Sequence, residues 1–203
     1  MRTWSAVLLG IAGFSLWGCS DGGGGPGVGP TTSWQVACSD DATSCGSSQD
    51  AHGPIGGTKT ETDKDDQDIS VSCSKTSAGY QITLEDPGRE MADPEDSTIR
   101  PRARSVVKIT NASVADNKCF VEVDEYARTG TKYVLKESCA GVRGGAQEGN
   151  CTLTGKANSN GYAFDGTLEC PGLRVNGQGP ADYKLGAARD FNSPMKLQIA
   201  HCN

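Results

Sequence analysis

Nine cysteines constrain the fold of this 203-residue chain more than any other feature of its sequence. Cys19 stands alone near the N-terminus, and the others are spread from position 38 to position 202. An even set of eight cysteines indicates four disulfides when a chain is exported from the cytoplasm. The eight are Cys38, Cys45, Cys73, Cys119, Cys139, Cys151, Cys170 and Cys202.

Zinc ligation is the competing interpretation of so many cysteines. No two of them are spaced C-x₂-C or C-x₄-C, and the only histidines are His52 and His201. Structural zinc sites need paired ligands at such short spacings. We therefore expect disulfides, with no metal site and no cofactor.

The N-terminal segment has the order of a secretory signal. Arg2 is followed by an apolar run of 13 residues from Trp4 to Leu16, and a charge before an apolar segment is typical of such signals. A membrane-spanning helix needs about 20 apolar residues. We therefore expect residues 1–18 to be a signal peptide rather than an uncleaved anchor; an ordinary secretory signal with an incidental cysteine is the other alternative.

The tetrapeptide Leu16-Trp17-Gly18-Cys19 resembles the lipobox of bacterial lipoproteins. The resemblance covers only this N-terminal segment, and Trp17 departs from the family's pattern, which has a smaller side chain there. It implies that Cys19 receives a diacylglycerol thioether and, after cleavage, an N-terminal acyl chain such as palmitate. Ser20 resembles the residue that directs sorting to the outer membrane. Lipidation of Cys19 would leave the even number of cysteines that four disulfides require.

The segment after Cys19 is a candidate tether. Residues 20–33 are mostly Gly, Pro, Thr and Ser, a composition that does not pack. Such a chain has an r.m.s. reach of about 20 Å. We therefore expect residues 19–33 to form a lipidated tether and residues 34–203 to form the folded domain.

The charge of the chain limits its partners. The formal net charge is −6, and removal of Arg2 with the signal makes it −7. An acidic protein without a basic stripe repels phosphate backbones. We therefore do not expect nucleic acid as a partner. We do expect contact with the membrane, through the lipid on Cys19.

Short apolar alternations recur along the rest of the chain and predict strands. They are separated by turn signals and show no helical period, which favours an all-β fold, a single antiparallel β-sandwich or barrel-like domain. The clearest turn is Asn160-Gly161, the strongest short hairpin signal in the chain. The alternating positions begin at Trp34, Ile69, Tyr80, Val107, Cys119, Tyr133, Leu153, Tyr162 and Met195.

Two charged segments allow both a functional and a structural interpretation. The acidic run 63–68 has carboxylates at alternate positions, but it lacks the glycine and glutamate of a calcium-binding EF-hand loop, so a solvated acidic turn is the simpler interpretation. Arg100, Arg102 and Arg104 follow an acidic stretch, Glu90 to Asp96. They could dock an acidic glycan or lipid headgroup, or they could simply neutralise that stretch.

No motif commits the chain to catalysis. His52 and His201 lie in no G-x-S-x-G or H-E-x-x-H context, so we expect no catalytic residue among them. Two functions stay open: a membrane-anchored, non-enzymatic binding or structural module that contacts an envelope glycan or protein, and a glycoside-type hydrolase that uses acidic residues in a β-sandwich cleft.

The pairing of the cysteines is one of 105 arrangements. Cys139 and Cys151 flank one glycine-rich loop, so we expect them to close it. Cys73 and Cys119 share faces with inward apolar residues, which suits a bridge between strands. The remaining expected pairs are Cys38 with Cys45 and Cys170 with Cys202.

Overall fold

A computed structural model describes much of the chain after the predicted tether. The described residues are 30–39, 45, 51–55, 69–87, 90–92, 99–101, 104–126, 132–139, 141–143, 146–188, 190 and 192–203. The predicted signal, Cys19 and the acidic run 63–68 lie outside this part. None of the described segments is a helix long and apolar enough to cross a membrane.

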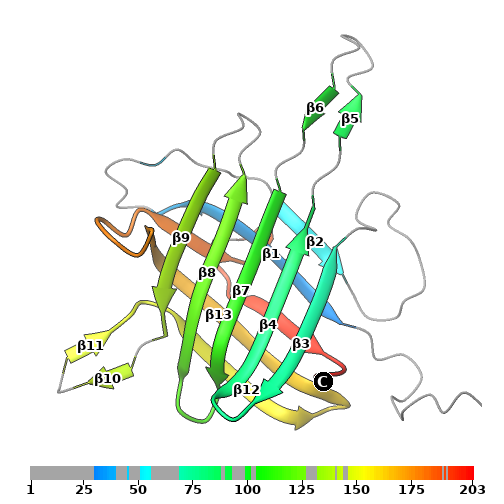
Figure 1. The fold of residues 1–203 in the computed structure, drawn as a ribbon, viewed down its shortest axis with the longest axis vertical. Helices are drawn as coiled ribbons and strands as arrows, with labels where there is room; N and C mark the ends of the chain where they lie inside the picture. Colours follow the sequence, from blue (N-terminus) through cyan, green and yellow to red (C-terminus); the bar gives the residue numbers. More distant parts are fainter. Residues whose placement is uncertain are drawn as a thin grey trace, which may run out of the picture.

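The described part is built from β-strands, which confirms the predicted all-β class (Figure 1). The first strand begins at Thr31, three residues before the predicted domain boundary, so the end of the expected tether belongs to the sheet. The strands are β1 (Thr31–Cys38), β2 (Ala51–Ile55), β3 (Ser70–Thr76), β4 (Gly79–Asp86), β5 (Glu90–Ala92), β6 (Ile99–Pro101), β7 (Arg104–Ser113), β8 (Lys118–Tyr126), β9 (Lys132–Ser138), β10 (Gly141–Arg143), β11 (Ala146–Glu148), β12 (Thr152–Ser159), β13 (Tyr162–Val175), β14 (Tyr183–Gly186) and β15 (Met195–Ile199).

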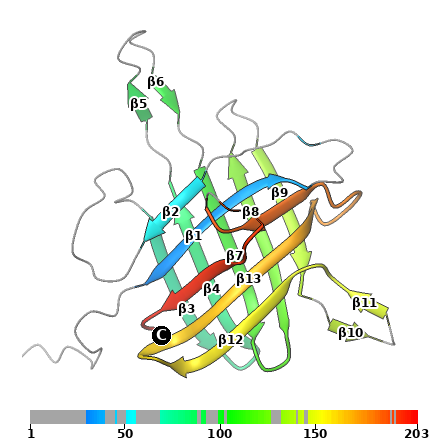
Figure 2. The same ribbon diagram turned by 180° about the vertical axis from the view of Figure 1, so that it is seen from behind.

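One antiparallel sheet folds over into two packed layers. Its strand order is β14-β1-β15-β13-β9-β8-β7-β4-β3, with β12 beside β13 and β2 beside β1. The front layer contains β3, β4, β7, β8 and β9, and the strands of the back layer cross it at a steep angle (Figures 1 and 2). Two hairpins, β5–β6 and β10–β11, extend beyond the layers.

Alternating side chains fill the space between the layers, as the sequence predicts. On β4, Tyr80, Ile82 and Leu84 are buried and the residues between them are more exposed. Trp34 and Phe164 are fully buried on the back layer, and the rings of Tyr80 and Phe164 meet edge to face at 5.4 Å. Burial of such side chains contributes about 1.5–3 kcal/mol each.

The turn between β12 and β13 is the one predicted from sequence. Ser159 pairs with Tyr162 across the two residues Asn160 and Gly161. Both turn residues have positive φ, 56° and 81°, as a type I′ turn requires. The Asn-Gly hairpin prediction is therefore confirmed.

Strand β13 joins the two layers on one side, which we call the β9–β13 seam. Its early residues pair with β15, and its last residues, Arg174 and Val175, pair with Lys136 and Leu135 of β9. The side chain of Glu137 is only 8% exposed and forms an ion pair with Arg174. Its carboxylate also accepts hydrogen bonds from the Asn150 amide at 3.2 Å and the Ser138 backbone at 3.0 Å. These donors offset the cost of burying a charge.

The C-terminus closes the opposite side, which we call the β3 seam. The Asn203 backbone accepts from Lys75 N at 2.7 Å and donates to Cys73 O at 3.0 Å, so the chain end lies along the outer edge of β3. Cys202 forms a disulfide with Cys73. An edge strand that would otherwise be open to pairing with another chain is thereby covered.

Four disulfides join the eight cysteines, as expected, but three of the predicted pairs are wrong. Cys38–Cys45 is confirmed. The other pairs are Cys73–Cys202, Cys119–Cys139 and Cys151–Cys170.

The corrections have a common physical reason, the adjacency of strands. Cys139 and Cys151 do lie side by side in an isolated backbone bridge. Each, however, is bonded across its own strand pair, to Cys119 beside β9 and to Cys170 on β13. Cys73 is on the edge strand β3, along which the last residues of the chain lie, and it is bonded to Cys202. The predicted pairs Cys139–Cys151, Cys73–Cys119 and Cys170–Cys202 are therefore replaced.

Removal of the β3-seam disulfide is expected to destabilise the fold more than removal of Cys38–Cys45. The two bridges span sequence separations of 129 and 7 residues, and the chain-entropy model gives about 5 and about 2 kcal/mol for loops of these lengths. Urea unfolding of Cys73→Ser/Cys202→Ser and of Cys38→Ser/Cys45→Ser measures the difference. An equal loss in the two double variants would contradict the proposed role of the β3 seam.

Candidate binding surface

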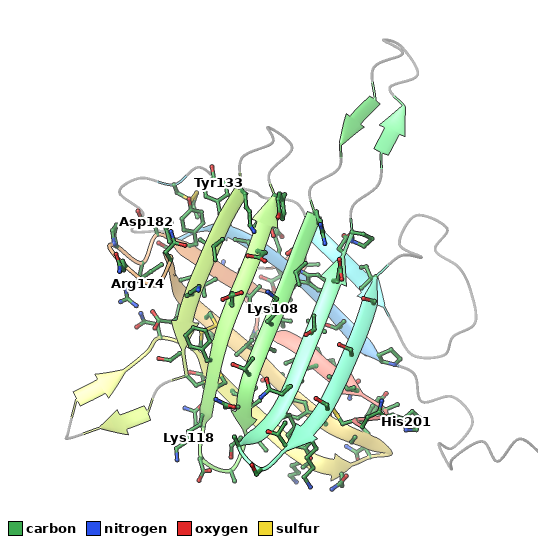
Figure 3. The ribbon with its side chains drawn as sticks, viewed as in Figure 1. Lys108, Lys118, Tyr133, Arg174, Asp182 and His201 are labelled. Atoms are coloured by element: carbon green, nitrogen blue, oxygen red, sulfur yellow. A yellow bond between two sulfur atoms is a disulfide. The ribbon has the colours of Figure 1, made fainter. Side chains whose placement is uncertain are left out.

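The candidate site is the solvent-facing side of β4, β7, β8 and β9, which we call the outer face. It faces the viewer in Figure 3, with Lys108 near its centre. Strand alternation produces it, because residues between the buried positions of each strand point away from the core. Its charged members are Glu85, Arg104, Lys108, Lys118, Glu122, Asp124, Lys132 and Lys136.

One row of the outer face combines two cations with an aromatic ring. Arg104, Tyr126 and Lys132 lie directly opposite one another on three adjacent strands; we call them the upper row. The Arg104 guanidinium carbon is 5.8 Å from the centre of the Tyr126 ring, and Lys132 Nζ is 5.1 Å from it. Cation–π contacts at exposed sites contribute about 0.5–1 kcal/mol each. Arg104 Nη2 also contacts Glu85 at 2.8 Å, which links β7 to β4.

A second row is a charge ladder. Lys108, Glu122 and Lys136 are also in register across β7, β8 and β9. Both lysine nitrogens lie 3.0 Å from the Glu122 carboxylate. Asp124 lies between the rows, 3.6 Å from Lys108 and 3.6 Å from Lys132. The outer face is therefore cross-linked by side chains as well as by backbone pairing.

The ladder shifts the pKa values of its members. Hydrogen bonds from Lys108 and then Lys136 lower the pKa of Glu122. The same bond to Glu122 raises the pKa of Lys108. In the upper row, a hydrogen bond to Tyr126, assisted by the charge of Asp124, raises the pKa of Lys132. These directions agree with the geometry, because each charged form is stabilised by its partner.

The outer face differs in charge from the rest of the chain. Its eight charged side chains are five cations and three carboxylates, a balance of +2. The whole chain carries −6, so everything outside this face sums to −8. A local field of opposite sign attracts partners that the rest of the surface repels.

An exposed phenylalanine adds apolar surface to the outer face. Phe120 is 41% exposed and lies on β8, six positions before Tyr126, or about 20 Å along the strand. Thr110 and Ser138 flank it on the adjacent strands. Aromatic rings on flat surfaces are common in binding sites.

The inner face holds a separate row of polar side chains. Asp86, Ser105 and Glu125 are directly opposite one another on β4, β7 and β8, and all are buried. Trp34 Nε1 donates to Ser105 Oγ at 2.9 Å. The two acidic residues are two strand spacings apart, about 10 Å. With Asp86 5% and Glu125 1% exposed, a polymeric substrate does not reach either carboxylate in this conformation.

The other residues singled out from the sequence do not converge on a site. His201 is exposed beside Cys202, and His52 lies on β2 in the other layer. Among the described residues, no group of three or more His, Cys, Asp and Glu side chains is placed to hold a metal ion. Of the three arginines considered for docking, Arg104 belongs to the outer face.

Most of the outer face was not identified from the sequence alone. The outward direction of Glu122 and Asp124 was predictable from alternation along β8. Their lysine partners were not, because they depend on the register between β7, β8 and β9. The sequence does contain a signal for Lys108 and Lys136: lysines at outward positions of two predicted strands, and carboxylates at outward positions of the predicted strand between them.

Comparisons with protein-family models, with curated proteins and with solved structures find no match to this chain. Its function is therefore inferred from its own residues and their geometry.

The Glu122 ladder is expected to stabilise the fold at neutral pH and not in acid. The folded-state pKa of Glu122 is lowered, so its contribution is present above the unfolded-state pKa and is lost as the pH falls through the folded-state pKa. Glu122→Gln should lower the free energy of unfolding by about 1 kcal/mol at pH 7, as for exposed ion pairs.

Urea unfolding at pH 7 and pH 3 measures this effect. The difference between wild type and Glu122→Gln should be smaller at pH 3 than at pH 7. Glu169→Gln, at an exposed position of β13, is the matched control. A Glu122→Gln effect that persists unchanged at pH 3 would refute the ladder's electrostatic role.

Proposed function

We propose that this protein is a lipid-anchored lipoprotein of the bacterial cell envelope, sorted to the outer membrane, and that its β domain is a non-enzymatic binding module. The lipobox-like segment ending at Cys19 supports the anchor. The four disulfides support an oxidising compartment outside the cytoplasm. Lipidation of Cys19 and the four disulfides together account for all nine cysteines.

The anchor and the domain would be connected by a short tether. The sequence between Cys19 and β1 comprises residues 20–30. A flexible glycine-rich chain of this length reaches about 20 Å. Each buried methylene of the acyl chains contributes about 0.8 kcal/mol to membrane binding, so two or three chains hold a protein firmly. The domain would thus stay near the membrane surface.

The outer face is the observation that carries the binding function. It presents cations and aromatic rings on one side of the sheet, and its ion pairs and register hold those side chains in place. A preorganised surface loses less entropy on binding than a flexible one. An envelope glycan or protein is the partner class that this surface suits.

A hydrolase is the second candidate, favoured by the inner row of Asp86, Ser105 and Glu125. The backbones of Asp86 and Glu125 are about 10 Å apart, which is short enough for their side chains to reach the carboxylate separation of inverting glycosidases. Their burial favours the binding function instead. If wild type hydrolysed envelope glycans and Glu125→Gln did not, the hydrolase would become the preferred function.

The anchor is tested by labelling cells with radioactive palmitate. Wild type should carry the label and sediment with membranes, and Cys19→Ser should carry none. Cys38→Ser, which alters another cysteine, should retain the label. Unlabelled wild-type protein in the soluble fraction would contradict the anchor.

The binding function is tested by co-sedimentation with lipid-extracted cell envelopes. Wild type should sediment with this material, and Arg104→Gln/Lys132→Gln should sediment less. Lys156→Gln/Lys196→Gln removes the same charge from exposed positions of the other layer and should behave as wild type. Equal sedimentation of all three proteins would contradict a role for the outer face.

A further inference from the structure

The upper row of the outer face has the chemistry of an anion-binding surface. Arg104 and Lys132 are 48% and 42% exposed in their side chains and stand on either side of Tyr126. They are two strand spacings apart, about 10 Å. Two cations separated in this way match a polymer with repeating anionic groups better than a single small anion.

The carboxylates near the upper row contact both cations but leave part of each side chain exposed. Arg104 contacts Glu85 through one nitrogen, Nη2, whereas a guanidinium carries five N–H donors. Lys132 is 3.6 Å from Asp124, which is longer than a hydrogen bond. Neither contact has the bidentate geometry that would commit the cation fully to an internal partner.

The upper row does not share a layer with the strand at which the described chain begins. The chain enters the fold at Thr31, which pairs with Gln198 of β15 in the back layer. The upper row lies on the front layer, at the upper ends of β7, β8 and β9 in Figure 1, whereas β1 begins lower down and behind. Thr31 therefore lies on the other layer from the upper row.

We infer that the upper row, Arg104, Tyr126 and Lys132, binds an anionic polysaccharide of the envelope. This inference rests on the proposed binding function and names its partner. The cations would pair with carboxylate or phosphate groups of the polymer, and the Tyr126 edge would contact the sugar between them. The charge balance of +2 on this face, against −9 in the rest of the chain once Arg2 is removed with the signal, would orient the acidic protein on the polymer.

The experiment measures binding of the full lipidated protein, in detergent micelles, to defined polymers. The probes are polygalacturonate, which carries carboxylates, phosphomannan, which carries phosphates, and neutral dextran. Wild type should bind at least one charged polymer and not dextran. Arg104→Gln/Lys132→Gln should weaken that binding by about tenfold or more, as expected for lost charge-assisted contacts. Higher salt should weaken it as well.

Two controls make the result specific to the upper row. Lys156→Gln/Lys196→Gln carries the same net charge as the test variant and should bind within about twofold of wild type. Its altered charges lie on the other layer, and salt screens their interaction with a polymer bound at the upper row. Tyr126→Leu should weaken binding while both cations are retained. Each variant is first shown to have the wild-type circular dichroism spectrum and to be fully folded under the conditions of the binding assay.

Several results would overturn the inference. They are failure to bind either charged polymer, equal binding of dextran, or an equal loss in the two double variants. Upper-row-dependent binding to phosphatidylglycerol vesicles without binding to either polymer would assign the row to lipid instead. If upper-row-dependent sedimentation with envelopes persists while both polymers fail to bind, only the partner is wrong; if sedimentation also fails, the proposed binding function falls with it.

Discussion

The closure of one folded sheet at two seams is the constraint on which the rest of the structure depends. At the β9–β13 seam, strand pairing is reinforced by the buried Glu137–Arg174 ion pair. At the β3 seam, Cys73–Cys202 and the backbone of Asn203 hold the chain end against the edge strand. Both seams join segments that are distant in sequence. Low aromatic content makes such cross-links important, because the core has few large rings to bury.

Closure explains the regular arrangement of side chains on the outer face. Strands β7, β8 and β9 are central in the sheet, with neighbours on both sides, so their outward side chains are held at fixed spacings. Ion pairs then connect these side chains across the strands. The inner side of the same strands is used for packing, and its carboxylates are buried. On these strands the ion pairs therefore lie on one side of the sheet and the buried carboxylates on the other.

Alternation made much of the fold predictable, because it acts between neighbours in sequence. Val121 and Val123 are buried while Glu122 is directed outward, as expected, and Asn160-Gly161 forms its turn. The cysteine pairs were less predictable. A disulfide forms between strands that are adjacent in the fold, and alternation along one strand does not say which strands those are. The upper row was hidden for the same reason: it depends on register across three strands, and β7 has a register shift between Thr110 and Ser113.

Lysine footprinting tests most directly whether the outer face is the binding surface. The protein is acetylated with and without lipid-extracted envelopes, and the modified sites are mapped by mass spectrometry. Protection is expected at Lys132, Lys108 and Lys136 and not at Lys156 or Lys196, which lie on the other layer. Protection of Lys156 and Lys196, with Lys132 still fully reactive, would contradict the account.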